Sequence, residues 1–143
     1  MSADPRTLGW LSRALAHEMR AVQQYLAQSV LARLWGDAAL AAELRREAEE
    51  EMQHAARLME RLIELGVAPA AGSILPARLG RTPADLLAAD RELEIDAVHL
   101  YREAAAHARR VRDSDSAALL EALLEEERRH VEEIDQLLSG GKP

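Results

Sequence analysis

The chain has 143 residues, a formal net charge of −7 and no cysteine. This length fits one domain with a single core, and the lack of cysteine excludes disulfides, thiolate-bound zinc and Cys-ligated iron–sulfur clusters. Asp and Glu (25) outnumber Lys and Arg (18), which argues against nucleic acid as a partner, and no signal segment or long apolar run argues for a membrane, so a cytoplasmic protein is expected.

Ala, Leu, Glu and Arg dominate and Phe is absent, so the predicted class is all-α. Apolar residues recur at helical spacing in four segments, which predict helices at 6–35, 38–65, 83–111 and 115–138. Only short breaks separate the first two helices and the last two, so each pair is expected to form an antiparallel hairpin. The segment 66–82 contains three glycines and two prolines and is long enough to run the length of a bundle. The sequence therefore predicts one domain over 1–143, a four-helix bundle of two hairpins joined by a long crossover.

The second and fourth predicted helices each carry a Glu-x-x-His motif, formed by Glu51 with His54 and by Glu127 with His130. Residues at i and i+3 share a helix face, so each motif directs one carboxylate and one imidazole to the same point. A single motif of this kind is weak evidence, because it arises often by chance in Glu-rich helices. The two motifs together, one in each hairpin, indicate a shared site.

A constant offset in residue number relates the two hairpins. It takes the first motif to the second, Glu18 to Glu94, and Tyr25 to Tyr101. Each hairpin thus supplies one lone Glu and one Glu-x-x-His, the ligand set of di-iron carboxylate bundles. All four glutamates lie in mainly apolar stripes, and four buried carboxylates repel one another strongly unless a cation neutralises them. Two divalent ions would balance the charge, and oxygen-rich ligation suits Fe or Mn better than structural zinc.

At these six positions the chain resembles the bacterioferritins in residue type, order and spacing, and the resemblance covers nearly the whole chain. It implies a ferritin-like fold and a ferroxidase that oxidises Fe(II) to Fe(III) with O₂ or H₂O₂, for iron storage or detoxification. It also implies that two Fe ions bind per subunit: Glu51 and Glu127 bridge them, Glu18 and Glu94 are terminal ligands, and His54 and His130 bind one each.

Two tyrosines are expected beside this site. Tyr25 matches a family tyrosine, and we expect it to hydrogen-bond a ligand carboxylate and so orient it. Tyr101 is expected either to do the same or to fill the core with a satisfied hydroxyl group.

Met52 follows a predicted metal ligand and therefore points about 100° away from it. From the residue alone it is a core gap filler. The resemblance implies instead that Met52 is an axial ligand of haem or a related iron porphyrin, one per dimer, bound across a twofold interface with one Met from each subunit.

The resemblance also sets expectations for the remaining histidines and for assembly. His17 precedes Glu18 and is expected at the surface or partly buried, with a place in a channel or beside the metal ligands as the alternative. His99 and His107 lie off the repeat and are expected to bind no metal. Bacterioferritins usually carry a short fifth helix at the fourfold axes of a 24-subunit shell, whereas only Ser139-Gly140-Gly141-Lys142-Pro143 follow the fourth predicted helix here. A homodimer within a closed shell of 12 or 24 subunits is expected, with a plain dimer as the alternative.

The sequence is compatible with two other functions. The same ligands would serve a di-iron or manganese oxidase or peroxidase that acts on a substrate other than iron. The buried acids could also pair with arginines or share protons, in which case the chain would be a metal-free structural bundle.

Overall fold

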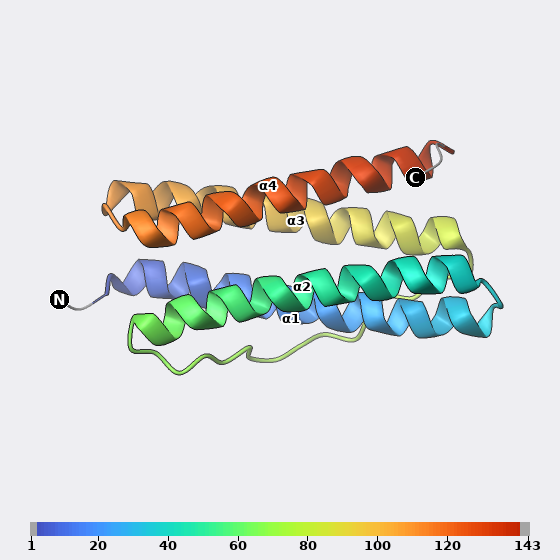
Figure 1. The fold of residues 1–143 in the computed structure, drawn as a ribbon, viewed down its shortest axis with the longest axis horizontal. Coiled ribbons are helices and arrows are strands. Elements are labelled where there is room, and N and C mark those ends of the chain that lie inside the picture. Colours follow the sequence, from blue (N-terminus) through green and yellow to red (C-terminus); the bar gives the residue numbers. More distant parts are fainter. Residues whose placement is uncertain (1–2, 141–143) are drawn as a thin grey trace.

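The computed structural model describes residues 3–140 and consists of four helices (Figure 1). They are α1 (Pro5–Leu34), α2 (Ala38–Glu64), α3 (Pro83–Arg110) and α4 (Ser114–Leu138). No strand occurs in that range. The all-α, ferritin-like bundle predicted from the sequence is confirmed.

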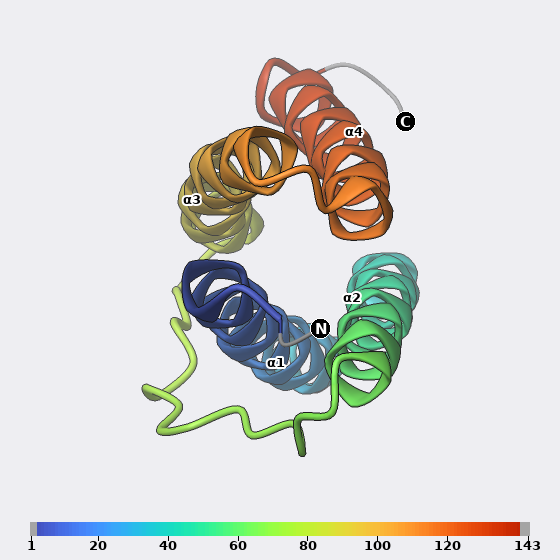
Figure 2. The ribbon, with the colours of Figure 1, turned by 90° about the vertical axis from the view of Figure 1, so that its left-hand side faces the viewer.

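The helices form two antiparallel hairpins, α1 with α2 and α3 with α4. The crossover returns along the outside of the bundle, so that α2 and α3 run in the same direction (Figure 1). Seen from the end, the four helices surround a common axis, with α1 beside α3 and α2 beside α4, so that α1 lies diagonally opposite α4 and α2 opposite α3 (Figure 2). Helix α1 packs most closely on α2, and α3 on α4, whereas the backbones of α2 and α4 stay farther apart. Side chains bridge the space between α2 and α4, where His54 contacts Glu127, His130 contacts Glu51 and Arg57 pairs with Glu126.

Side-chain caps fix where each helix begins. Asp4, Asp37 and Asp113 each accept a hydrogen bond from the backbone N–H three residues on, at 2.9 to 3.1 Å. At α3, Thr82 and Asp85 form a reciprocal capping box. Such caps satisfy amide groups that have no partner within the helix, so each hairpin turn ends at an aspartate cap, Asp37 or Asp113.

The crossover is tied to α1 through two amide side chains. Gln23 Nε2 donates to the carbonyl oxygen of Leu75, and Gln28 Nε2 donates to that of Arg78, both at 3.0 Å. Arg78 also pairs with Glu92 on α3. These contacts hold a segment without secondary structure along the bundle.

Two apolar clusters fill the interior. One gathers Leu11, Leu15, Leu58, Leu62, Leu120 and neighbouring small residues, and the other gathers Tyr25, Leu44, Leu86, Leu93 and their neighbours. Along α1, α2 and α3 the predicted metal ligands come between the two clusters, and on α4 they follow the residues of the first cluster, so a polar layer crosses the bundle. None of the described helices has the length and apolarity that a bilayer span requires.

Candidate metal centre

Six acidic and imidazole side chains meet in the polar layer, and they are the six predicted ligands. Helix α1 supplies Glu18, α3 supplies Glu94, and α2 and α4 each supply one Glu-x-x-His pair. All four carboxylates are fully buried, and the two imidazoles are at most 6% exposed. The shared face of i and i+3 residues, repeated in each hairpin, therefore brings all six together.

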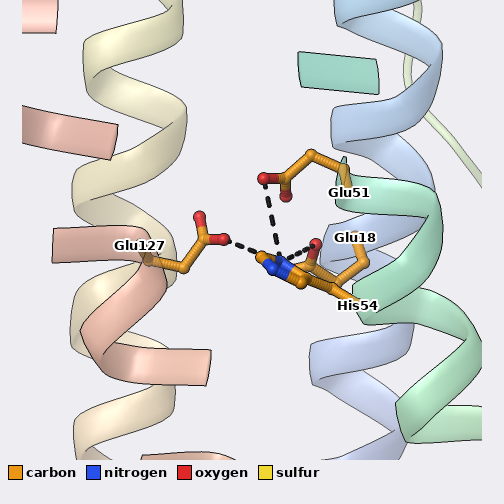
Figure 3. Close-up of side chains that lie close together, drawn as sticks. All are labelled: Glu18, Glu51, His54 and Glu127. Atoms are coloured by element: carbon orange, nitrogen blue, oxygen red, sulfur yellow. Dashed lines mark ion pairs between the residues drawn. The ribbon is translucent and has the colours of Figure 1, made fainter. Parts of the chain in front are cut away.

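Three carboxylates surround His54, as Figure 3 shows. Its Nδ1 lies 3.0 Å from Glu127 Oε1, 3.4 Å from Glu18 Oε2 and 3.8 Å from Glu51 Oε1. Potential ligand atoms of these four residues all lie within 4.8 Å of one another. The three helices α1, α2 and α4 thus offer oxygen and nitrogen donors to one point.

His130 has an equivalent set of neighbours. Its Nδ1 lies 2.7 Å from Glu94 Oε2, 3.2 Å from Glu51 Oε1 and 3.7 Å from Glu127 Oε1. These donors also fall within 4.8 Å of one another. The two imidazole rings stack with centroids 6.1 Å apart. Glu51 and Glu127 belong to both groups, whereas Glu18 and Glu94 belong to one each.

In the metal-free protein, the imidazoles are the counter-ions of the acids. Burial opposes protonation of both rings, but the nearby carboxylates of Glu127 and Glu18 raise the pKa of His54 to about 10. The carboxylate of Glu94 does most to raise the pKa of His130, to about 11. Burial and then carboxylate neighbours raise the pKa of Glu51 and of Glu94. Two imidazolium ions and shared protons thus make the acid cluster tolerable.

The donor set fits divalent cations. Most oxygens of the four glutamates have no hydrogen-bond partner, and no Arg of residues 3–140 lies within 4.0 Å of these carboxylates. Buried carboxylate oxygens without partners are costly. Four carboxylates and two imidazoles would satisfy two metal ions with oxygen-rich ligation.

The tyrosines beside the site behave differently. Tyr101 Oη donates to Glu18 Oε1 at 2.7 Å, so this tyrosine orients a carboxylate. Tyr25 is buried, but its hydroxyl group has no partner in the described part of the chain. The hydrogen bond expected of Tyr25 is therefore absent from the described residues. Tyr101, the equivalent residue of the other hairpin, makes such a bond to Glu18.

The other histidines lie away from both groups. His17 Nε2 is 3.0 Å from the carbonyl oxygen of Leu93, and His107 Nε2 is 2.7 Å from Asp4 Oδ2 at the cap of α1. His99 is exposed on α3.

Sequence reasoning missed the acids on the outer nitrogens of the two rings. His130 Nε2 lies 2.8 Å from Glu50 and 3.6 Å from Glu47, while His54 Nε2 lies 3.6 Å from Glu126, which pairs with Arg57 at 2.8 Å. The offset that relates the two hairpins also relates Glu50 to Glu126, so the repeat contained a signal for these contacts.

Known proteins match nearly the whole chain. The ferritin-like domain model matches residues 9–142. The bacterioferritin of Rhodobacter capsulatus is 34% identical over 139 residues, which cover 97% of this chain and 86% of that protein. The bacterioferritin of Mycobacterium bovis is 31% identical over 138 residues, or 96% of this chain and 87% of that protein. The chain belongs to the bacterioferritin family.

The fold agrees with that assignment. The solved structure of Rhodobacter capsulatus bacterioferritin superposes with a TM-score of 0.93 at 34% identity, covering 97% of this chain and 87% of the solved one. That bacterioferritin has a metal-free dinuclear site and a haem iron in a crystallographic special position.

Two features expected by resemblance to bacterioferritins lie outside the metal centre. Met52 is 54% exposed on α2, so its side chain is accessible to a partner or a bound group. Residues 3–140 form four helices and no fifth, and the last three positions of the expected tail, 141–143, lie outside the described residues.

Proposed function

We propose that this chain is a bacterioferritin-like ferroxidase that binds two Fe(II) ions per subunit and oxidises them to Fe(III). The observation that carries the proposal is the set of four buried carboxylates gathered around two imidazoles, without an arginine partner among residues 3–140. A dinuclear cation site accounts for their number, type and burial together. The relatives named bacterioferritin support iron as the metal.

The protein's own residues act by positioning. Glu51 and Glu127 face both rings and would bridge two ions, Glu18 and His54 would complete one set, and Glu94 and His130 the other. Holding both Fe(II) substrates side by side lets one oxidant, O₂ or H₂O₂, take an electron from each. The hydrogen bond from Tyr101 fixes one terminal carboxylate. The imidazoles must lose their protons before they can ligate a metal, so iron binding releases protons.

Aerobic titration with Fe(II) tests this proposal against its main alternative. A ferroxidase oxidises many irons per subunit, whereas an oxidase or peroxidase for another substrate stops near two. The variant Glu51→Gln should lose the activity, and Glu49→Gln, which neutralises an exposed carboxylate on the same helix, should keep it. Protein that retains fewer than one metal per chain when loaded anaerobically would favour the metal-free structural bundle.

We also propose that Met52 is the axial ligand of a haem or related iron porphyrin, one per homodimer. An exposed thioether on α2 fits a ligand that meets its copy across a twofold axis. Met52→Leu should abolish the Soret band after haem reconstitution and leave iron oxidation largely intact. The control Met59→Leu changes a partly buried methionine of the same helix, and it should keep the band.

Membership of the bacterioferritin family also supports a proposal for the oligomeric state and the cellular location. We propose a homodimer within a closed shell of 12 or 24 subunits, with residues 1–143 as one cytoplasmic ferritin-like domain. Neither nucleic acid nor membrane is a proposed partner. The mass of the assembly in solution, measured by light scattering, separates a shell from a plain dimer.

A further inference from the structure

A buried acid that is no predicted metal ligand lies one helical turn from the site. Asp90 of α3 is fully buried and precedes Glu94 by four residues, on the same helix face. Its Oδ1 accepts a hydrogen bond from Gln24 Nε2 at 2.9 Å, and its Oδ2 has no hydrogen-bond partner. In the sequence, Asp90 only interrupts an apolar stripe, but the structure places it inside the bundle.

The fold does not require a polar group at this place. The offset between the two hairpins relates Asp90 to Ala14, Gln24 to Leu100 and Gln28 to Ala104. Ala14 and Ala104 are buried, and Leu100 packs against the apolar core. The region that the offset relates to this one, also between α1 and α3, is thus built from apolar residues. A buried carboxyl group present in only one of two equivalent halves indicates a task beyond packing.

A small cavity joins Asp90 to the metal centre. It has a volume of about 30 Å³, and Tyr25, Glu47, Asp90 and His130 contribute to its walls. That is enough space for one water molecule, and these groups supply the two or more polar partners that a buried water needs. Tyr25 and Asp90, which both line this cavity, each have a buried oxygen without a hydrogen-bond partner. In the other half of the site, around His54, the equivalent tyrosine is Tyr101, and its hydroxyl group already has a hydrogen-bond partner in Glu18.

We propose that Asp90 is a proton acceptor for the His130 half of the site, which takes up protons displaced by metal binding through the cavity it shares with Tyr25. The inference rests on the proposed function, because it needs a metal that displaces protons. In each transfer, a proton leaves a ligand as the metal takes its lone pair, passes to the Asp90 carboxylate and then exits to solvent. Asp90 itself binds no metal; it accepts protons from the metal ligands and passes them on.

The surroundings of Asp90 suit a reversible acceptor near neutral pH. Burial raises its pKa to about 7, and the hydrogen bond from Gln24 keeps it from rising further. The titratable and charged side chains that face it from the packed elements are Tyr25 of α1, Glu43 and Glu47 of α2, Arg78 of the crossover, and His130 and Glu133 of α4. Only Arg78 is a permanent cation, and it does not line the cavity that Asp90 shares with His130.

Rapid mixing of the full-length, metal-free protein with Co(II) tests the inference without any redox step. Cobalt absorption reports metal binding, and a pH indicator in weak buffer reports the released protons. Asp90→Asn keeps the shape of the side chain and its hydrogen bond from Gln24 but cannot accept a proton. We expect it to slow proton release at least tenfold while the final occupancy stays at two ions per chain. Asp96→Asn, an exposed change on the same helix, should match the wild type.

Two further measurements distinguish a proton acceptor from a structural residue. The rate of proton release by the wild type should increase through pH 7, and Asp90→Asn should lose that dependence. In Asp90→Ala, which vacates the volume of the carboxyl group, added formate should restore the fast phase, and an equal concentration of chloride should not.

Each contrary result has a distinct meaning. Unchanged proton release in Asp90→Asn overturns the inference and leaves the proposed function intact. Slow release accompanied by fewer than two bound ions also overturns it, because Asp90 would then be part of the ligand structure. A wild type that binds no Co(II) overturns the proposed function and the inference together.

Discussion

Replacing Glu51 with Gln should remove most of the stabilisation of the protein by metal. Glu51 is the α2 carboxylate that lies near both imidazoles, and it belongs to both donor groups. The change keeps the size of the side chain and removes only its charge. Burial raises the pKa of Glu51, so the metal-free fold favours its neutral form, and a neutral amide fits the same place. Metal-free Glu51→Gln should therefore be at least as stable as the wild type at pH 7.

The stabilisation that Glu51→Gln should lose can be calculated from the coupling between metal binding and folding. A ligand at 100 times its Kd stabilises the folded state by about 2.7 kcal/mol per site, so two independent sites give roughly 5 kcal/mol. For a domain of this size, 1 kcal/mol shifts the unfolding temperature by roughly 2–4 °C. Saturating Co(II) should thus raise the unfolding temperature of the wild type by roughly 10–20 °C, and that of Glu51→Gln by only a few degrees.

Thermal unfolding followed by circular dichroism, with and without Co(II), measures this difference. The matched control is Glu49→Gln, which removes one exposed carboxylate two residues away and should keep the full shift. A full shift in Glu51→Gln would refute the bridging role of Glu51. Equal loss of the shift in both variants would show that overall charge, and not the site, governs the effect.

Three other predictions concern the same centre. Glu94 belongs only to the His130 group, so Glu94→Gln should bind one Co(II) tightly, and two tight ions in a titration would contradict the grouping. Tyr101→Phe removes the donor to Glu18 and should weaken binding about 10- to 100-fold by calorimetry; unchanged affinity would exclude an orienting role. The raised pKa values of His54 and His130, about 10 and 11, stabilise the metal-free fold fully below their ordinary value of 6.5 and progressively less towards those values. The unfolding temperature of the metal-free protein should therefore fall between pH 6.5 and 10, and a flat profile would argue against imidazolium counter-ions.

The sequence predicted the bundle and the convergence of six side chains because both depend on local periodicity. Helical spacing determines which face a residue occupies, and the internal repeat places equivalent faces in each hairpin. Glu18 and Glu94 could be identified only through that repeat, since a lone Glu in a helix carries no motif. The caps at Asp37 and Thr82 are equally local, which explains why the helix ends lie close to the expected positions.

Contacts between helices were harder to predict. The sequence favoured Tyr25 as the tyrosine that orients a ligand, but Tyr101 makes the hydrogen bond. Asp90 interrupts an apolar stripe, and its burial depends on the amide of Gln24 from another helix. The pairing of Glu126 with Arg57 likewise joins α4 to α2. Which partner a side chain meets across the core depends on packing geometry, and the pattern of a single helix does not contain it.

The most direct test of the dinuclear centre is anomalous diffraction at the iron edge from crystals soaked anaerobically in Fe(II). We expect two iron peaks inside each subunit, one beside Glu18 and His54 and the other beside Glu94 and His130, with Glu51 and Glu127 between them. A single peak, or iron found only on the surface while the six side chains keep their mutual contacts, would contradict the account.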